Sequence, residues 1–118
     1  MYWIQKEKNG QKRSEQLHEG DGLIERRALF KTESRLPINM EIWELNSGVS
    51  EGDHIHGKEK PLEEIYYFLE GEGKMTINGK EISVSKGDAI MIPPGVDHGL
   101  YNNGEKTLKL VIIWGNEI

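Results

Sequence analysis

The chain has 118 residues, no cysteine and a formal net charge of -5. This length predicts one domain that is large enough to bury a core without disulfides. The absence of cysteine excludes both disulfides and thiolate metal ligands. The negative charge argues against nucleic acid as the main partner, because phosphate-binding proteins need a positive surface. No apolar stretch approaches the ~20 residues of a membrane span, and the first residues lack a basic start followed by a long apolar run. We therefore expect a cytoplasmic protein with no membrane partner.

Residues 1–20 are polar and interrupted by glycine and are expected to form an N-terminal arm, in which residues 6–11 predict a loop or a frayed segment. Within this arm, Tyr2, Trp3 and Ile4 are bulky, and we expect them to dock on the outer face of the domain or on a partner subunit. His18 has no partner within reach in the sequence, so we interpret it as a surface histidine rather than a metal ligand.

Two strands are predicted before the histidine-rich part of the chain. The alternating pattern of residues 23–31 predicts the first strand and places Arg26 on its mostly apolar face. An arginine in that position either meets a substrate carboxylate or packs its stem and keeps its charged end in water. Residues 38–45 predict a strand that is apolar on parts of both faces, as in a barrel wall that also contacts another sheet or subunit.

Three of the four histidines lie between Gly48 and Asn102. His54 and His56 are two residues apart, so on an extended segment their side chains point to the same side. Glu64 begins a run of β-branched and aromatic residues that predicts a buried strand. His98 follows a rigid Pro-Pro-Gly corner. Imidazoles and a carboxylate that converge inside a β-structure predict a divalent transition-metal site.

The spacing of these residues resembles the two sequence motifs of the cupin superfamily. The first motif would span residues 48–71 and is carried by Gly48, His54, His56, Glu64 and Gly71. The second would span residues 87–102 and is carried by Gly87, Pro93, Gly95, His98 and Asn102. The resemblance implies one cupin domain over residues 1–118, folded as a double-stranded β-helix, the jelly-roll barrel of that superfamily. It also implies one ion of iron, manganese, nickel, cobalt, copper or zinc, with His54, His56, Glu64 and His98 as its ligands.

The first motif departs from the family pattern at one place. Seven residues separate His56 from Glu64, where the usual pattern has three or four. The carboxylate ligand could therefore be Glu59, Glu63 or Glu64. We choose Glu64, because its six-residue distance to Gly71 is that of the family and the inserted residues are typical of an enlarged loop before the strand.

The clearest hairpin surrounds Asn78-Gly79, the preferred pair for a two-residue type I′ turn. This turn pairs Ile77 with Lys80, and it puts the apolar residues of both strands on one face, so turn chemistry and hydrophobic pattern agree.

Further strands are predicted over residues 89–92 and 107–114, with a second hairpin signal at residues 101–104. Short strands separated by turns about every ten residues, without any helix-length amphipathic segment, predict an all-β sandwich or barrel.

Strand alternation also predicts the pocket around the metal. If Glu64 faces the ion, Tyr66 lies on the same side, and alternation from His98 brings further residues inside. The predicted substrate pocket is lined by Phe68, Leu100, Asn102 and Arg26. Tyr66 is the candidate catalytic residue, as a proton donor or acceptor, with a packing role as the alternative.

The cupin resemblance leaves the function open, because one fold and one ligand set serve many activities. Our first hypothesis is a metal-dependent enzyme, an oxygenase, isomerase or lyase, that acts on a small oxygen-bearing metabolite. The alternative is a binding or sensing module that holds a small molecule through the metal without turnover.

We also expect a homodimer. The strand segments Ile65-Tyr67-Leu69 and Val111-Ile113 turn apolar side chains to the outer face of the barrel, and these need cover that a single small domain does not supply.

Overall fold

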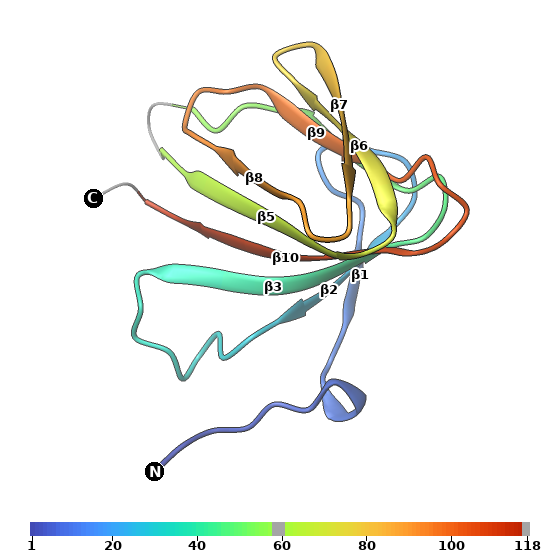
Figure 1. The fold of residues 1–118 in the computed structure, drawn as a ribbon. Helices are drawn as coiled ribbons and strands as arrows, with labels where there is room; N and C mark the ends of the chain where they lie inside the picture. Colours follow the sequence, from blue (N-terminus) through green and yellow to red (C-terminus); the bar gives the residue numbers. More distant parts are fainter. Residues whose placement is uncertain (58–60, 117–118) are drawn as a thin grey trace.

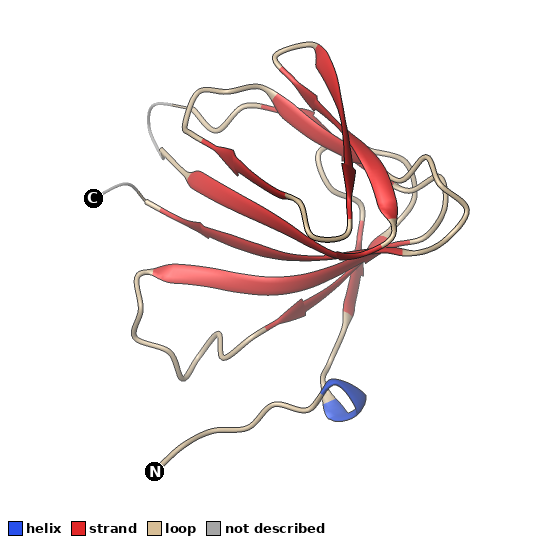
Figure 2. Ribbon diagram, in the orientation of Figure 1, coloured by secondary structure: helices blue, strands red, loops and turns tan. Residues whose placement is uncertain are grey.

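The computed structural model describes residues 1–57 and 61–116 and folds them into two antiparallel β-sheets (Figures 1 and 2). The strands are β1 (Arg13–Glu15), β2 (Ile24–Ala28), β3 (Ile38–Leu45), β4 (Ser50–His54), β5 (Glu63–Glu70), β6 (Glu72–Ile77), β7 (Lys80–Ser85), β8 (Ala89–Ile92), β9 (His98–Tyr101) and β10 (Leu108–Gly115). The 3₁₀ turn η1 (Glu7–Asn9) is the only helical element in the described ranges, where nothing helical is long and apolar enough to cross a membrane. The all-β jelly-roll prediction is confirmed.

The larger sheet has the strand order β1-β2-β3-β10-β5-β8. Its centre is β10, which pairs along its length with β3 on one side and β5 on the other, so that Leu110 lies beside both Trp43 and Phe68. Every second residue of β10 faces the core, as the apolar pattern predicted, and Leu110 and Ile112 are fully buried. β10 thus lies inside the larger sheet, with a hydrogen-bonded strand on each side.

The smaller sheet has the order β4-β9-β6-β7 and faces the larger one (Figure 1). The predicted hairpin at its edge is confirmed, since β6 and β7 pair Ile77 with Lys80. Asn78 and Gly79 have φ values of 49° and 79°, the left-handed conformation that a type I′ turn needs at both positions. The other sheet neighbour of β6 is β9, which carries His98.

Most strand boundaries follow the local sequence pattern. β3 and β8 have the predicted bounds, and β10 is displaced by one residue. β2 is shorter than predicted, because Phe30 has a φ of 49° and the extended conformation ends before it. The faces of β2 are as expected, with Ile24 buried in the core and Arg26 on the same side.

The N-terminal arm contains a strand that the sequence did not indicate, because β1 pairs with β2 at the edge of the larger sheet. One prediction about connections is wrong. Residues 101–104 do not form a hairpin, because β9 and β10 lie in different sheets and the chain crosses between them there. Asn102 holds this crossing together, since its amide donates to the carbonyl oxygens of Leu45 and Lys106 at 2.9 and 2.8 Å. Turn-forming residues alone do not distinguish a hairpin from a crossing.

Tyr2, Trp3 and Ile4 are between 60 and 79% exposed, and the segment runs away from the sheets (Figure 1). Docking of these residues on the outer face of the same domain is therefore not seen. Docking on a partner subunit stays a prediction.

Leu110 should be far more sensitive to truncation than Ile113, its neighbour on the opposite face of β10. Leu110→Ala removes a fully buried side chain from the core and should lower the free energy of unfolding by about 2–5 kcal/mol. Ile113→Ala, on the half-buried outer face, should cost less than about 1.5 kcal/mol in a monomer. Urea denaturation at a protein concentration where the chain is monomeric measures both losses, and equal losses there would contradict the assignment of the core face.

Candidate metal centre

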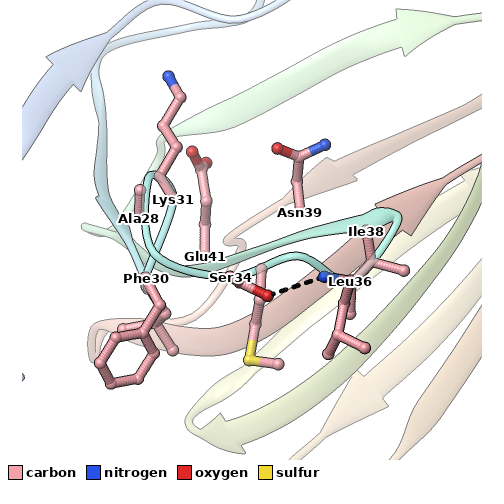
Figure 3. A pocket seen from close by; sticks show the side chains of 10 residues that line it. Ala28, Phe30, Lys31, Ser34, Leu36, Ile38, Asn39 and Glu41 are labelled. Carbon is pink, nitrogen blue, oxygen red and sulfur yellow. Dashed lines mark hydrogen bonds between the residues drawn. The ribbon is translucent and has the colours of Figure 1, made fainter. Parts of the chain in front are cut away.

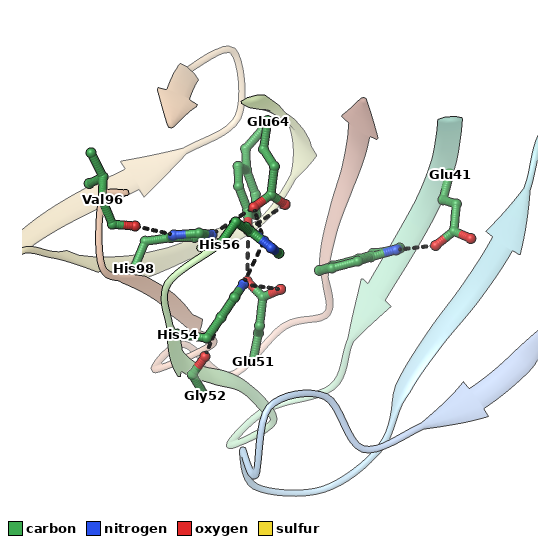
Figure 4. A network of polar contacts seen from close by, with 10 residues as sticks. Glu41, Glu51, Gly52, His54, His56, Glu64, Val96 and His98 are labelled. Carbon is green, nitrogen blue, oxygen red and sulfur yellow. Dashed lines mark hydrogen bonds and ion pairs between the residues drawn. The ribbon is translucent and has the colours of Figure 1, made fainter. Parts of the chain in front are cut away.

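The four predicted ligands converge between the two sheets (Figure 4). His54 ends β4, His56 lies in the following loop, Glu64 is near the start of β5 and His98 begins β9. The Nε2 atoms of His54 and His56 are 3.2 Å apart, and Glu64 Oε1 lies 2.7 Å from His56 Nε2 and 2.8 Å from His98 Nε2. We refer to these four side chains as the His/Glu cluster.

The spacing of the donor atoms fits a metal ion. Two ligands that bind at right angles, each about 2.1 Å from an ion, are about 3.0 Å from one another. The measured separations of 2.7 to 3.2 Å lie around this value. Imidazole nitrogens with one carboxylate oxygen are a donor set that suits divalent transition metals. The cluster therefore has both the chemistry and the spacing to hold one ion.

Backbone carbonyls orient two of the imidazoles. His54 Nδ1 donates to the carbonyl oxygen of Gly52 at 2.9 Å, and His98 Nδ1 donates to that of Val96, also at 2.9 Å (Figure 4). Because the proton of each neutral ring then lies on Nδ1, Nε2 is left as the free electron-pair donor. Such outer hydrogen bonds are the usual means of fixing the tautomer and orientation of metal-binding histidines.

Of the three carboxylates left open by the sequence, Glu64 is the one in the cluster. It is buried at 5% exposure, whereas its neighbour Glu63 is more exposed and turns to the other face of β5. Glu59 lies outside the described residues. The strand alternation that starts at Glu63 explains why only one of these two adjacent carboxylates faces inward.

Burial and mutual contacts shift the pKa values of the cluster. Burial lowers the pKa of His54 to about 4, so this ring is neutral at neutral pH. Burial disfavours the charged forms of Glu64 and His98. The hydrogen bond and the charge attraction between these two side chains favour the charged forms more strongly. The pKa of Glu64 is therefore lowered and that of His98 is raised. A proton shared by this pair occupies the place that a metal ion takes, so metal uptake competes with protonation of His98.

Glu51 is a member of the site that the sequence analysis missed. It is 3% exposed, its Oε1 accepts a hydrogen bond of 2.8 Å from the Tyr66 hydroxyl, and its Oε2 lies 4.0 Å from His54 Nε2. Burial raises the pKa of Glu51 to about 8 and that of Tyr66 well above its usual value. Strand alternation predicts that residues 51 and 54 point to opposite faces. A register shift between them, in the pairing of β4 with β9, turns both side chains inward.

His18 is exposed at the surface, as predicted, but it has partners that the sequence did not indicate. Its ring stacks on that of His54, with the centroids 3.4 Å apart and the planes within 8°. Together with Glu51 and His54 it forms a second group of metal-ligand type. His54 offers only Nε2, however, because Nδ1 is hydrogen-bonded, so the His/Glu cluster and this second group cannot hold an ion through His54 at the same time.

Arg26 is held by carboxylates and does not extend into water. Its Nε donates to Glu41 Oε1 at 2.7 Å and its Nη1 donates to Glu15 at 3.1 Å, while the guanidinium lies 5.5 Å from the centre of the Trp43 ring. Glu41 is itself buried and also accepts hydrogen bonds from Trp43 and Arg13. This network fixes one wall beside the cluster, since a buried carboxylate with several donors is held in one orientation.

A cavity of about 180 Å³ adjoins the cluster. Its lining consists of Leu17, His18, Arg26, Trp43, Glu51, His56, Leu62, Glu64, Ile112 and Trp114. Arg26 therefore lies at the cavity, and its role as a substrate-pocket residue stays a prediction. Phe68, Leu100 and Asn102 are fully buried in the core and are not among the residues that line it. Tyr66 is also fully buried, and its hydroxyl reaches the site by its hydrogen bond to Glu51.

A second hollow of about 130 Å³ lies at the far end of β2 and β3, around Phe30 and Ser34 (Figure 3). The carboxylate of Glu41, which also borders it, is bound by the arginines described above. No histidine lines this hollow among the described residues, so it has no metal-ligand set. Among the described residues, the groups of metal-ligand type are the His/Glu cluster and the neighbouring group of His18, Glu51 and His54.

Comparison with known proteins identifies the domain. A family model described as a cupin domain matches residues 41–114. An oxalate-binding protein from Thermotoga maritima is 36% identical over 69 residues, which are 58% of this chain and 54% of the relative. An uncharacterised protein from Methanocaldococcus jannaschii is 49% identical over 49 residues, 42% of this chain and 39% of that protein. The matches span about half of these relatives or less.

Solved structures show the same fold. The crystal structure of a predicted oxalate decarboxylase from Thermotoga maritima has a TM-score of 0.89 at 24% identity, and the match covers 98% of this chain and 100% of that one. The cupin domain of Schizosaccharomyces pombe Cnp3 has a TM-score of 0.69 at 17% identity, with 80% of this chain and 65% of that one covered. At these identities the likeness concerns the fold alone.

The buried Glu51 should make metal-free protein less stable as the pH rises. The folded protein keeps the Glu51 proton up to a pKa of about 8, whereas the unfolded chain loses it near 4.5. The folded state thus binds more protons between these values, and its stability falls as pH rises through this window. In Glu51→Gln this fall should be about 3–4 kcal/mol smaller between pH 5 and pH 8. Urea denaturation in the presence of a chelator measures it.

The control for this experiment is Glu72→Gln, which changes an exposed glutamate. Its pH dependence should match that of the wild type. If Glu51→Gln and the wild type lose stability equally across the window, Glu51 does not hold a proton in the folded protein.

Proposed function

Because the chain belongs to the cupin domain family, we propose that its His/Glu cluster holds one divalent transition-metal ion, beside which a small carboxylate binds. The observation that carries the proposal is the convergence of three Nε2 atoms and Glu64 Oε1 at separations suited to one ion. Two of the three rings also have their other nitrogen fixed by a backbone carbonyl. Residues that met by chance would have no reason to present their free nitrogens to a common point.

Four protein ligands leave two positions of an octahedron for other groups. A bound ion would supply Lewis-acid polarisation of a ligand oxygen at those positions. The donor set is compatible with iron, manganese, nickel, cobalt, copper or zinc, because affinity for such sites follows the metal series and the resident ion depends on supply. The residues of the chain would orient the bound molecule and keep bulk water out.

The size and lining of the cavity favour a small anion. At about 180 Å³ it has room for a few non-hydrogen atoms, since one water molecule occupies about 30 Å³ in the liquid. The metal position lies on its wall and favours negative charge, whereas the charge of Arg26, which also lines it, is balanced by Glu41 and Glu15. The oxalate-binding relative supports a carboxylate, and oxalate is the first compound to test.

Catalysis is a second candidate function, and Glu51 is the observation that favours it. A carboxyl group with a pKa of about 8 carries a proton at neutral pH, and this one lines the same cavity as the cluster. It could deliver that proton to a bound molecule, with the Tyr66 hydroxyl holding it in place from behind. Incubation of metal-loaded protein with oxalate, followed by NMR detection of formate, distinguishes turnover from binding alone.

We also propose that the chain forms a homodimer through the outer face of the larger sheet. Two rows of apolar side chains cross four paired strands there. The first row is Met91, Ile65, Ile113 and Met40, and the second is Ala89, Tyr67, Val111 and Ile42. Tyr67 is 45% exposed and Met91 57%. Antiparallel sheets that face water carry polar residues on that side, so this composition favours a covered surface.

Glu64→Gln should weaken metal binding about tenfold or more, whereas Glu63→Gln should change the affinity by less than about threefold. The amide introduced by Glu64→Gln would retain the shape of the side chain but lose the charge that an ion needs, while Glu63 faces away from the cluster. Elemental mass spectrometry of untagged protein and titration with Co²⁺ measure the two effects. Equal affinities would contradict the ligand assignment.

Tyr67→Lys should convert a dimer into a monomer, because it places a charge in the centre of the apolar rows. Tyr101→Lys is the matched control, since Tyr101 is also 45% exposed but belongs to the smaller sheet. Light scattering at micromolar concentration should give twice the 13.5-kDa chain mass for the wild type and the control. A wild-type mass of one chain would contradict the dimer.

A further inference from the structure

We propose that His18 is a further ligand-contacting residue, which donates a hydrogen bond to an oxygen of the small carboxylate bound beside the His/Glu cluster. This inference rests on the proposed function and names a residue outside both cupin motifs. His18 lies on the connection between β1 and β2, 36 residues before His54 in the sequence. Nothing in the local sequence around it indicates this role.

His18 lines the same cavity as His56 and Glu64. Its ring is parallel to the His54 ring at 3.4 Å and stands nearly perpendicular to the His56 ring, with centroids 6.1 Å apart. Stacking covers one ring face, so polar contacts of His18 have to be made through the nitrogens at the ring edge. His18 is exposed at the surface and also lines the cavity, so a molecule bound in the cavity can replace water at that edge.

The backbone around His18 is held against β4. The carbonyl oxygen of Leu17 accepts hydrogen bonds from the N–H groups of Gly20 and Gly52, at 3.0 and 3.1 Å. A Cβ atom at Gly52 would overlap the carbonyl oxygen of His18, so this close approach of two backbones requires glycine. His18 itself has a φ of 52°, a left-handed conformation that is uncommon for a residue with a side chain. Glu19 has a φ of 59° as well, and the hydrogen bond from Gly20 to Leu17 closes a turn over these two residues.

Two other polar groups of the cavity wall already have partners. Arg26 donates to two carboxylates, and Glu51 accepts from Tyr66. Among the described residues, none forms a hydrogen bond with a ring nitrogen of His18. A neutral imidazole has one N–H donor, and an oxygen of a carboxylate is a strong acceptor for it.

The competing role for His18 is that of a metal ligand, with Glu51 and His54. It is disfavoured because His54 has one free nitrogen, which is 3.2 Å from His56 Nε2 and is therefore directed into the His/Glu cluster. An ion in the cluster uses that nitrogen and leaves His18 free to contact the bound anion.

Two substitutions separate hydrogen bonding from stacking. His18→Phe keeps an aromatic ring that can stack on His54 but has no N–H group, and His18→Gln supplies an N–H donor without the ring. Calorimetric titration of Mn²⁺-loaded protein with oxalate should show binding weakened about tenfold in His18→Phe and by no more than about threefold in His18→Gln. Affinity for Mn²⁺ alone, measured first, should stay within about threefold of the wild type in both variants, which also establishes that they are folded.

Each other result overturns the inference. Oxalate binding by His18→Phe at wild-type strength means that the ring does not donate to the ligand. A tenfold or larger loss of Mn²⁺ affinity in both variants means that His18 is a metal ligand instead. Wild-type protein that binds Mn²⁺ but no oxalate overturns the carboxylate proposal and this inference with it, whereas wild-type protein that binds no metal overturns the metal centre first.

Discussion

The arrangement of this molecule depends on a contact between its two sheets. Glu64 comes from β5 in the larger sheet, and His98 comes from β9 in the smaller one, yet their side chains meet at 2.8 Å. An ion pair buried at this depth is costly unless further groups satisfy its remaining donors and acceptors. His56 and the Val96 carbonyl do so here, and a metal ion would do so more completely. The contact between Glu64 and His98 therefore does two things: it forms part of the candidate metal centre, and it joins the two sheets.

A layer of polar groups supports this contact from behind. Tyr66 links Glu51 to the cluster, and Trp43 links the cavity wall to Glu41, so buried carboxylates lie on two sides of the site (Figure 4). Each has at least one donor, and Glu41 has two arginines as well. The polar groups beside the cavity are therefore held in fixed orientations by their hydrogen bonds. The small anion proposed as the ligand would exchange water for groups that are already oriented, which would lower the cost of ordering on binding.

Local sequence rules predicted those parts of the fold that depend on neighbours along the chain. The Asn78-Gly79 turn fixed the register of its hairpin, because left-handed φ angles at both positions admit few other conformations. The apolar alternation of β10 indicated its core face for a similarly local reason. The crossing at Asn102 was predicted wrongly, because a turn signal does not specify which strand the chain pairs with next. Pairing partners are chosen by the packing of whole sheets.

The sequence by itself indicated the His/Glu cluster, since the resemblance of both motifs to those of cupins implied its side chains, with Glu64 chosen from three candidate carboxylates. The absence of cysteine excluded thiolate ligands. Only the tertiary structure decided what surrounds them. Glu51 faces inward because of a register shift that no periodic pattern encodes. His18 reaches His54 because the β1–β2 connection packs on β4 through glycine backbones far apart in the sequence. Motif spacing reflects local geometry, whereas the groups that complete a site are brought to it by contacts between distant segments.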